Sequence, residues 1–156
     1  MARQGTVTDL RDAGPSPIQP RGPFVSKPTV LVVDDDLDIL DLVQLALENL
    51  HGWNVLTADG GSAAIELCRE HQPDVVLLDI MMPTMDGLQA YEHLQADPAT
   101  SSIPVILFTA KGRAGMWRSA DTSGIRGMIP KPYDPMGLGG QIVEILGWQD
   151  SDWDAR

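Results

Sequence analysis

The sequence lacks three features that are typical of exported, membrane-bound or disulfide-stabilised proteins. It contains a single cysteine, Cys68, so it cannot form an internal disulfide. No apolar stretch approaches the roughly 20 residues that a membrane-spanning helix needs. The N-terminus has no continuous apolar core of the kind that a secretory signal requires. We therefore expect a soluble, cytoplasmic protein that makes no membrane contact, with Cys68 as a buried, reduced thiol.

Basic residues are also scarce, because 11 lysines and arginines stand against 22 aspartates and glutamates, for a formal charge of −11. This surplus of carboxylates argues against direct binding of nucleic acid. The same charge is compatible with a site that attracts a divalent cation. Apolar residues make up 43% and charged residues 21% of the 156 residues, which is the composition and length of one globular domain.

The composition divides the chain into three parts. Residues 1–27 contain several prolines and glycines, no apolar periodicity, and four basic residues against two acidic ones. We expect this leader to be disordered or loosely attached, either as an uncommitted tail or as an address or docking arm. Residues 28–148 form the expected folded domain, and residues 149–156 an acidic, solvated tail. No internal repeat is visible, and we expect no second folded segment on either side of residues 28–148.

Five short apolar runs predict the buried strands of a parallel sheet. These runs are Thr29–Val33, Trp53–Ala58, Val75–Leu78, Val105–Phe108 and a brief one near Gly127–Ile129. Each run is followed by a segment that is expected to form a helix, and strands that alternate with helices imply a sheet with right-handed crossovers and helices on both faces. The predicted fold class is therefore α/β.

The predicted helices rest on apolar residues at helical spacing and on start and stop signals. The first contains Ile39 and stops near Gly52, and the second follows Gly60 and Gly61. The third contains Leu88 and ends around Asp97 and Pro98, the fourth covers residues 111–121, and the fifth starts at Asp134 and Pro135. The apolar side of the second is formed by Ala64, Ile65, Leu67 and Cys68. The helix over residues 111–121 is the weakest prediction, because Gly112 and Gly115 each cost about 1 kcal/mol relative to alanine. We expect a short or mobile element there.

Polar residues follow four of the five predicted strands. Asp34 and Asp35 follow the first strand, Asp79 the third, Thr109 the fourth and Lys131 the fifth. Because the carboxyl ends of parallel strands share one edge of the sheet, where open α/β folds bind ligands, we expect these residues to converge. Taken alone, Asp79 could merely cap a turn. The run D-D-D could likewise lie in a solvated turn or helix cap, or two of its carboxylates could hold a cation.

The converging residue types suit phosphoryl transfer. Carboxylate oxygens are the ligands that a hard cation such as Mg²⁺ prefers, together with phosphate oxygens. The carboxylate of Asp79 can attack phosphorus and form an acyl phosphate. Thr109 can donate a hydrogen bond to one phosphoryl oxygen, and Lys131 can neutralise charge on another.

Four motifs, in order and at matching spacing, make residues 28–148 resemble the receiver domains of two-component response regulators, the CheY-like family. They are V-L-V-V-D-D-D, V-V-L-L-D-I-M-M-P-T-M-D-G, V-I-L-F-T-A and I-P-K-P-Y. The resemblance implies a CheY/flavodoxin-like (βα)5 fold, with a five-stranded parallel sheet in the order 2-1-3-4-5.

The resemblance also implies a role for each site residue. Asp79 resembles the phosphoacceptor. Asp35, Asp79 and the backbone carbonyl of Met81 resemble the Mg²⁺ ligands, with Asp34 acting through water. Thr109 resembles the family's switch hydroxyl, and Lys131 its phosphate-pairing lysine. The peptide bond from Lys131 to Pro132 is expected to be cis.

Three departures from the family pattern stand out. Met128 lies where the family usually has an aromatic switch residue, three positions before the lysine. Met81 lies at a position, two after the phosphoacceptor, that is often polar. The chain stops after its last helix, so we expect a stand-alone, single-domain type with no DNA-binding or enzymatic output domain.

We therefore expect a receiver that takes a phosphoryl group from a histidine kinase or a histidine phosphotransfer protein. It would catalyse only its own phosphorylation and dephosphorylation. As a monomer or weak dimer, it would signal to an unknown downstream protein through its fourth helix, fifth strand and fifth helix. One alternative is a receiver-like interaction module that is never phosphorylated in the cell. Another is a metal-dependent phosphatase with an aspartyl nucleophile, although such enzymes carry a D-x-D pattern and here Ile80 and Met81 follow Asp79.

Overall fold

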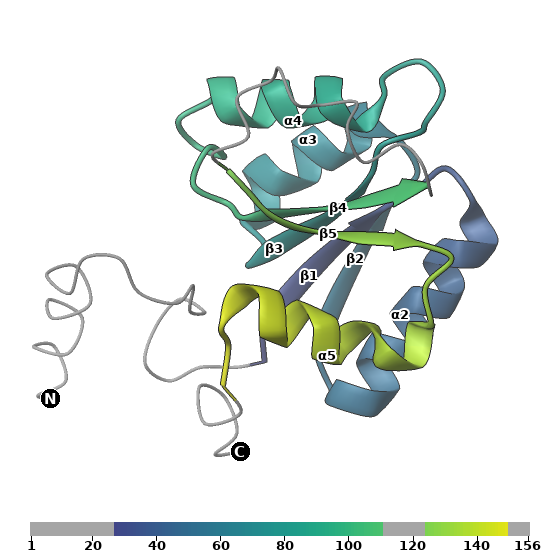
Figure 1. Cartoon of the computed structure of the whole chain (residues 1–156). Coiled ribbons are helices and arrows are strands. Elements are labelled where there is room, and N and C mark those ends of the chain that lie inside the picture. The colour runs from purple at the N-terminus through teal and green to yellow at the C-terminus, as the bar shows by residue number, and fades with distance from the viewer. Residues whose placement is uncertain (1–26, 111–123, 150–156) are drawn as a thin grey trace, which may run out of the picture.

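The computed structural model describes residues 27–110 and 124–149, which Figure 1 draws as coloured ribbon. Five strands and four helices lie within these described residues. In chain order they are β1 (Thr29–Val33), α2 (Leu37–His51), β2 (Asn54–Ala58), α3 (Gly61–His71), β3 (Val75–Asp79), α4 (Gly87–Ala96), β4 (Val105–Ala110), β5 (Ile125–Lys131) and α5 (Pro135–Leu146). The helix predicted over residues 111–121 lies outside the described residues. No helix in the described part of the chain is long and apolar enough to cross a membrane.

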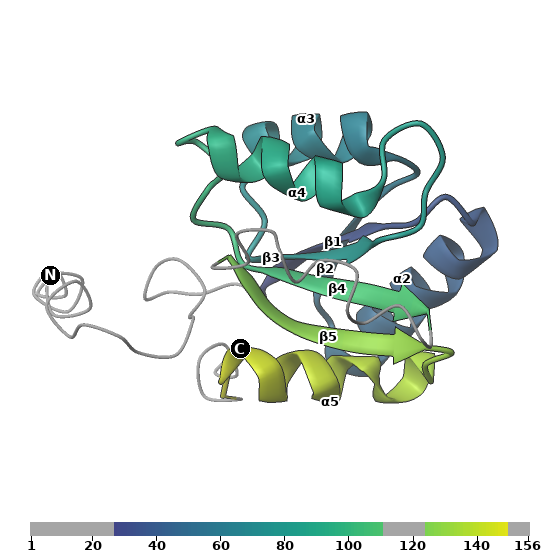
Figure 2. The same cartoon turned by 45° about the horizontal axis from the view of Figure 1, so that its top comes forward.

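The strands form one parallel sheet in the order β2-β1-β3-β4-β5, as predicted. Figures 1 and 2 show α2 and α5 on one face of the sheet and α3 and α4 on the other. Helices on both faces explain why the central strands are continuous apolar runs: every residue of β3 is buried. The carboxyl ends of β1, β3, β4 and β5 meet at one edge.

Successive residues of each strand point to opposite faces and so feed two cores. Under α2 and α5 the core includes Val32, Leu77 and Phe108, all fully buried. Under α3 and α4 it includes Leu31 and Leu78, also fully buried. Each such side chain contributes about 1.5–3 kcal/mol of burial free energy, so the two cores hold the strand ends rigidly in place.

The helix boundaries agree with the predicted start and stop signals. Asp36 is the N-cap of α2, with its side chain accepting from the N–H groups of Asp38 and Ile39, and Gly52 ends that helix in a left-handed conformation. Asp134 caps α5, whose first residue is Pro135. These caps orient the chain where it leaves the sheet edge, so they also position the residues that follow the strands.

Four of the five strands differ from the prediction at one or both ends. β3 and β4 continue one and two residues further than predicted, to Asp79 and Ala110. β5 extends over Ile125–Lys131 rather than the brief run near Gly127–Ile129. It is an edge strand that pairs with β4 alone, and an edge position tolerates Pro130 and an exposed Arg126. The second strand begins at Asn54 rather than Trp53, because the N–H of Trp53 donates to the carbonyl of Leu47 in the last turn of α2, at 3.4 Å.

Candidate metal centre

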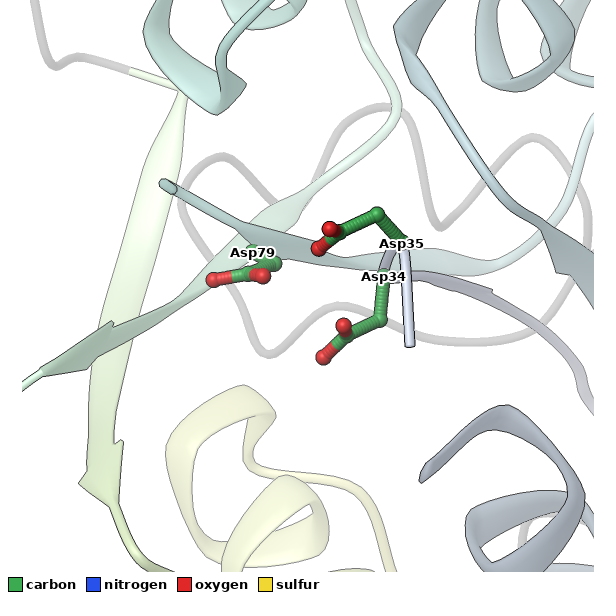
Figure 3. A group of neighbouring side chains, drawn as sticks. All are labelled: Asp34, Asp35 and Asp79. Atoms are coloured by element: carbon green, nitrogen blue, oxygen red, sulfur yellow. The ribbon is translucent and has the colours of Figure 1, made fainter. Parts of the chain in front are cut away.

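Three carboxylates gather at the carboxyl edge of the sheet, as Figure 3 shows. Asp34 and Asp35 directly follow β1, and Asp79 is the last residue of β3. One carboxylate oxygen from each residue lies within 4.8 Å of the others. The predicted convergence of these residues is therefore confirmed.

Lys131 reaches the same cluster from the end of β5. Its Nζ lies 3.2 Å from Asp34 Oδ2 and 3.2 Å from Asp79 Oδ1. The register of the sheet explains this contact between residues 97 positions apart, since Lys131 pairs with Ala110 at the same edge. Thr109 lies in β4 with its backbone opposite Pro130, at the edge that the sequence predicted. The side chain of Thr109 is outside the described part of the structure.

Backbone amides hold two of the carboxylates in place. Asp34 Oδ1 accepts a hydrogen bond from the N–H of Asp36 at 2.9 Å, and Asp79 Oδ1 accepts one from the N–H of Met81 at 3.2 Å. Asp34 is 1% exposed and Asp79 is 3% exposed, whereas Asp35 faces solvent. The cluster therefore has two fixed, buried carboxylates and a third at its mouth.

The carboxylates of the cluster repel one another, and a bound cation would offset this repulsion. Burial, and then the neighbouring carboxylate of Asp34, raise the pKa of Asp79, and Lys131 only partly opposes this. Burial of Lys131 would lower its own pKa, but the carboxylates of Asp79 and Asp34 outweigh burial and raise it. Carboxylate oxygens so close together, with one ammonium against three carboxylates, fit a hard divalent cation such as Mg²⁺.

The third aspartate of D-D-D has a structural role. Asp36 accepts hydrogen bonds from Asp38 N at 3.0 Å and Ile39 N at 3.4 Å, and so caps α2. Asp36 therefore has the helix-cap role that the sequence left open for the run, while Asp34 and Asp35 belong to a cluster that could hold a cation.

Two further expectations concern residues beside Asp79 and Lys131. The Lys131–Pro132 peptide bond is cis, as predicted. The side chain of Met81 is 46% exposed, and its N–H is the donor to Asp79. A role for the Met81 carbonyl as a ligand stays a prediction. Met128 is half-buried and packs against the core under α3 and α4.

Gly87 is a residue of the site whose role the sequence analysis missed. Its N–H donates to the carbonyl of Ile80 at 2.8 Å. A Cβ at this position would collide with the carbonyl oxygen of Asp79 and lie 2.7 Å from the Cα of Ile80. Only glycine therefore allows α4 to begin this close to the end of β3. The dipeptide D-G before a predicted helix was the available sequence signal. It does not reveal that Gly87 lies against the backbone of Asp79 and Ile80.

Tyr133 was also missed as part of the site. Its ring stacks on Phe108 with centroids 4.5 Å apart, and its hydroxyl is buried with no hydrogen-bond partner among the described residues. Burial, followed by the charges of Asp34 and Asp79, raises its pKa. Tyr133 lines a cleft of about 460 Å³ together with Asp34, Lys131 and apolar residues of α2. The carboxylate cluster thus opens beside a cleft that is largely apolar.

Comparison with known proteins assigns this arrangement to a family, since residues 30–142 match the response regulator receiver domain. The chain belongs to this receiver family. It is 39% identical over 117 residues to the protein PilH of Pseudomonas aeruginosa. The aligned region covers 75% of this chain and 96% of PilH. It is also 40% identical over 105 residues to TcrX of Mycobacterium tuberculosis. This second aligned region covers 67% of this chain but only 44% of TcrX.

The receiver fold is also found in solved structures. The chemotaxis response regulator CheY4 of Vibrio cholerae superposes with a TM-score of 0.70 at 25% identity, over 78% of this chain and all of CheY4. Phosphorylation on aspartate and binding of Mg²⁺ are general properties of receiver domains. In this receiver, Asp34, Asp35 and Asp79 form the group that could hold such an ion.

Proposed function

We propose that this receiver accepts a phosphoryl group on Asp79 from a phosphohistidine of a histidine kinase or histidine phosphotransfer protein. The observation that carries the proposal is the position of Lys131 Nζ, 3.2 Å from Asp79 Oδ1, beside carboxylate oxygens that lie within 4.8 Å of one another. A buried nucleophilic carboxylate, a fixed ammonium and a set of hard cation ligands are the groups that aspartyl phosphorylation requires.

Each residue then has a defined task. A carboxylate oxygen of Asp79 bonds to phosphorus as the bond from phosphorus to the histidine nitrogen breaks, and that nitrogen keeps the electron pair. Lys131 pairs with the phosphoryl oxygens, and the hydroxyl of Thr109 donates to one of them. Asp34, Asp35, Asp79 and the Met81 carbonyl are the proposed Mg²⁺ ligands, with Asp34 acting through water. The ion would supply positive charge to the phosphoryl oxygens.

The signal would leave through protein contacts. We propose an output surface formed by the segment at residues 111–121, β5 and α5, recognised by a downstream protein. The half-buried Met128 on β5 is compatible with a surface that repacks, because methionine adapts its shape without one defined rotation. The receiver would act in the cytoplasm as a monomer or weak dimer, catalysing only its own phosphorylation and dephosphorylation.

Intact-mass measurement with a small phosphodonor tests the proposal. Incubation with phosphoramidate and Mg²⁺ should add the mass of one phosphoryl group to the chain and to Asp36→Asn, a neighbouring carboxylate with a capping role. Asp79→Asn should gain none. An adduct that persists in Asp79→Asn contradicts the assignment of the acceptor. A folded chain that gains no adduct would favour the unphosphorylated interaction module, and turnover of external phosphate esters would favour the phosphatase.

A further inference from the structure

An apolar groove of about 380 Å³ lies on the surface between α2 and the start of α5, on the face of the sheet that these helices cover in Figure 2. Its lining residues are Leu42, Leu45, Ala46, Asn49, Leu50, Pro135 and Met136. Leu45 is 57% exposed and Met136 is 62% exposed. Large apolar side chains gathered in this way on a surface indicate an interaction site.

The groove continues into the cleft beside the carboxylate cluster. Leu42 and Pro135 line both, and the cleft also contains Asp34, Lys131 and Tyr133. A segment bound in the groove therefore extends toward the mouth of the candidate site.

The chain enters the fold next to one end of this groove. The carbonyl of Lys27 accepts from Asn54 Nδ2 at 3.2 Å, and the carbonyl of Pro28 accepts from Asn54 N at 2.9 Å. These bonds fix residue 27 beside Gly52, the C-cap of α2. Leu50 lies two residues before Gly52, so the 26 residues that precede Lys27 join the fold about half a helical turn from the groove.

The sequence before Lys27 has a pattern that suits an apolar groove. Pro17, Pro20 and Pro23 are spaced by three residues. A polyproline II helix has three residues per turn, so in this conformation the three prolines share one face. Proline-rich segments bind apolar grooves at a low entropic cost because their backbone is already restricted.

The length of the segment before Lys27 and the charge of Arg21 are both compatible with a path along α2. The six residues from Lys27 back to Arg21 extend about 19 Å as polyproline II. The distance along α2 from Gly52 back to Asp38 is about 21 Å. Arg21 thus reaches the exposed Asp38 and Asp41, which lie one helical turn before Leu42 and Leu45.

We propose that residues 17–25 bind in cis along the α2–α5 groove, with Pro23 against the leucines and Arg21 beside Asp38 and Asp41. Pro20 and Pro17, on the same face, then continue into the adjoining cleft. A second copy of the chain is a poorer occupant. The chain carries a charge of −11, so two acidic α2 faces would repel each other. By contrast, the only charged residues between Ala13 and Pro28 are Arg21 and Lys27, both basic. The proposal holds whether or not Asp79 is phosphorylated.

Paramagnetic broadening in the full chain tests the proposal. A spin label on Gln19→Cys, in a Cys68→Ala background with labelled methionine and leucine methyl groups, should remove intensity from Met136 and Leu45. The signal of Met128, which packs against the core on the opposite face, should keep its intensity. Unchanged Met136, or equal loss at Met128, overturns the proposal. Broadening that persists between separately spin-labelled and isotope-labelled molecules assigns the contact to a second copy and also overturns it.

A second measurement avoids the change at the buried Cys68. In the chain with its natural cysteine, Arg21→Glu should shift the methyl signals of Met136 and Leu45, because it places a third acidic group beside Asp38 and Asp41. Arg21→Lys should leave these signals close to their original positions. If Arg21→Glu also leaves them unchanged, residues 17–25 do not occupy the groove.

Discussion

At the scale of single residues, Met81 distinguishes this site from receivers with a polar residue two positions after the acceptor. Its exposed side chain offers bulk but no useful hydrogen bond to a water that attacks the acyl phosphate. On the proposed function, Met81→Asn should lose its phosphoryl group faster than the unmodified chain, measured by intact mass over time. Met136→Asn, another exposed methionine, serves as the control with an unchanged rate. An equal or slower loss from Met81→Asn contradicts this role.

Cys68 is a buried residue to which we assign no chemical role. Burial raises the pKa of its thiol to about 12, and the side chain is fully buried in the core under α3 and α4. Only about one thiol in 10⁵ would be ionised at pH 7. We expect iodoacetamide to modify Cys68 in denaturant but not in the native protein. Mass spectrometry measures the extent of modification over time. Rapid modification of the native protein would contradict the prediction, because it would show that the thiol is accessible.

At the scale of elements, the turn from β1 to α2 combines a cap with a ligand pair. Asp36→Ala removes the acceptor for two N–H groups at the start of α2 and should destabilise the protein by about 1 kcal/mol relative to Asp36→Asn. Asparagine keeps the cap and removes the same charge, so the comparison isolates the hydrogen bonds. Equal urea midpoints for the two variants would show that the cap contributes nothing.

The ends of α3 and α4 are tied together by Asp97. Its Oδ2 accepts from Arg69 Nε at 2.8 Å and its Oδ1 from Ala99 N at 2.9 Å. These bonds hold the pKa of Asp97 below its ordinary value of 3.8. A lowered folded-state pKa contributes stability above the unfolded-state pKa, and this stability is lost as the pH falls through the folded-state value.

Asp97→Asn should therefore lower stability at pH 7, and the difference from the unmodified chain should shrink below about pH 4. Urea unfolding across this pH range measures the difference. Arg69→Gln should reproduce the pattern, since it removes the partner. A difference that grows toward low pH would contradict the sign of the pKa shift.

At the scale of the whole molecule, the carboxylates at the sheet edge link the stability of the fold to cation binding, because burial and mutual repulsion oppose their charged forms. Mg²⁺ that binds the folded chain alone should raise its unfolding free energy by about 1.4 kcal/mol at ten times the dissociation constant. Asp35→Asn should lose this increase, whereas Asp41→Asn, an exposed aspartate of α2, should keep it. Thermal unfolding with Mg²⁺ or with a chelator gives the comparison. A Mg²⁺ effect that survives in Asp35→Asn removes Asp35 from the site.

Much of this molecule could be predicted from the sequence because the signals are local. β1 ends at Val33, α2 ends at Gly52 and α5 begins at Pro135, as apolar runs, a glycine and an Asp-Pro pair indicated. Convergence of Asp34, Asp79 and Lys131 also followed, since strand ends of a parallel sheet share an edge. The order of the strands, however, came from the resemblance to receivers, because no local pattern specifies which strands are neighbours.

The tertiary structure decided what depends on distances between remote residues. Asp35 belongs to the carboxylate cluster and Asp36 caps α2, because their side chains point in different directions. The run D-D-D does not specify these directions. Gly87 matters because another element's backbone lies against it, and Tyr133 because Phe108 lies beneath its ring. The length of β5 depended on its place at the edge of the sheet. Local propensity acts over a few residues, whereas close approach and exposure are set by the packing of the entire chain.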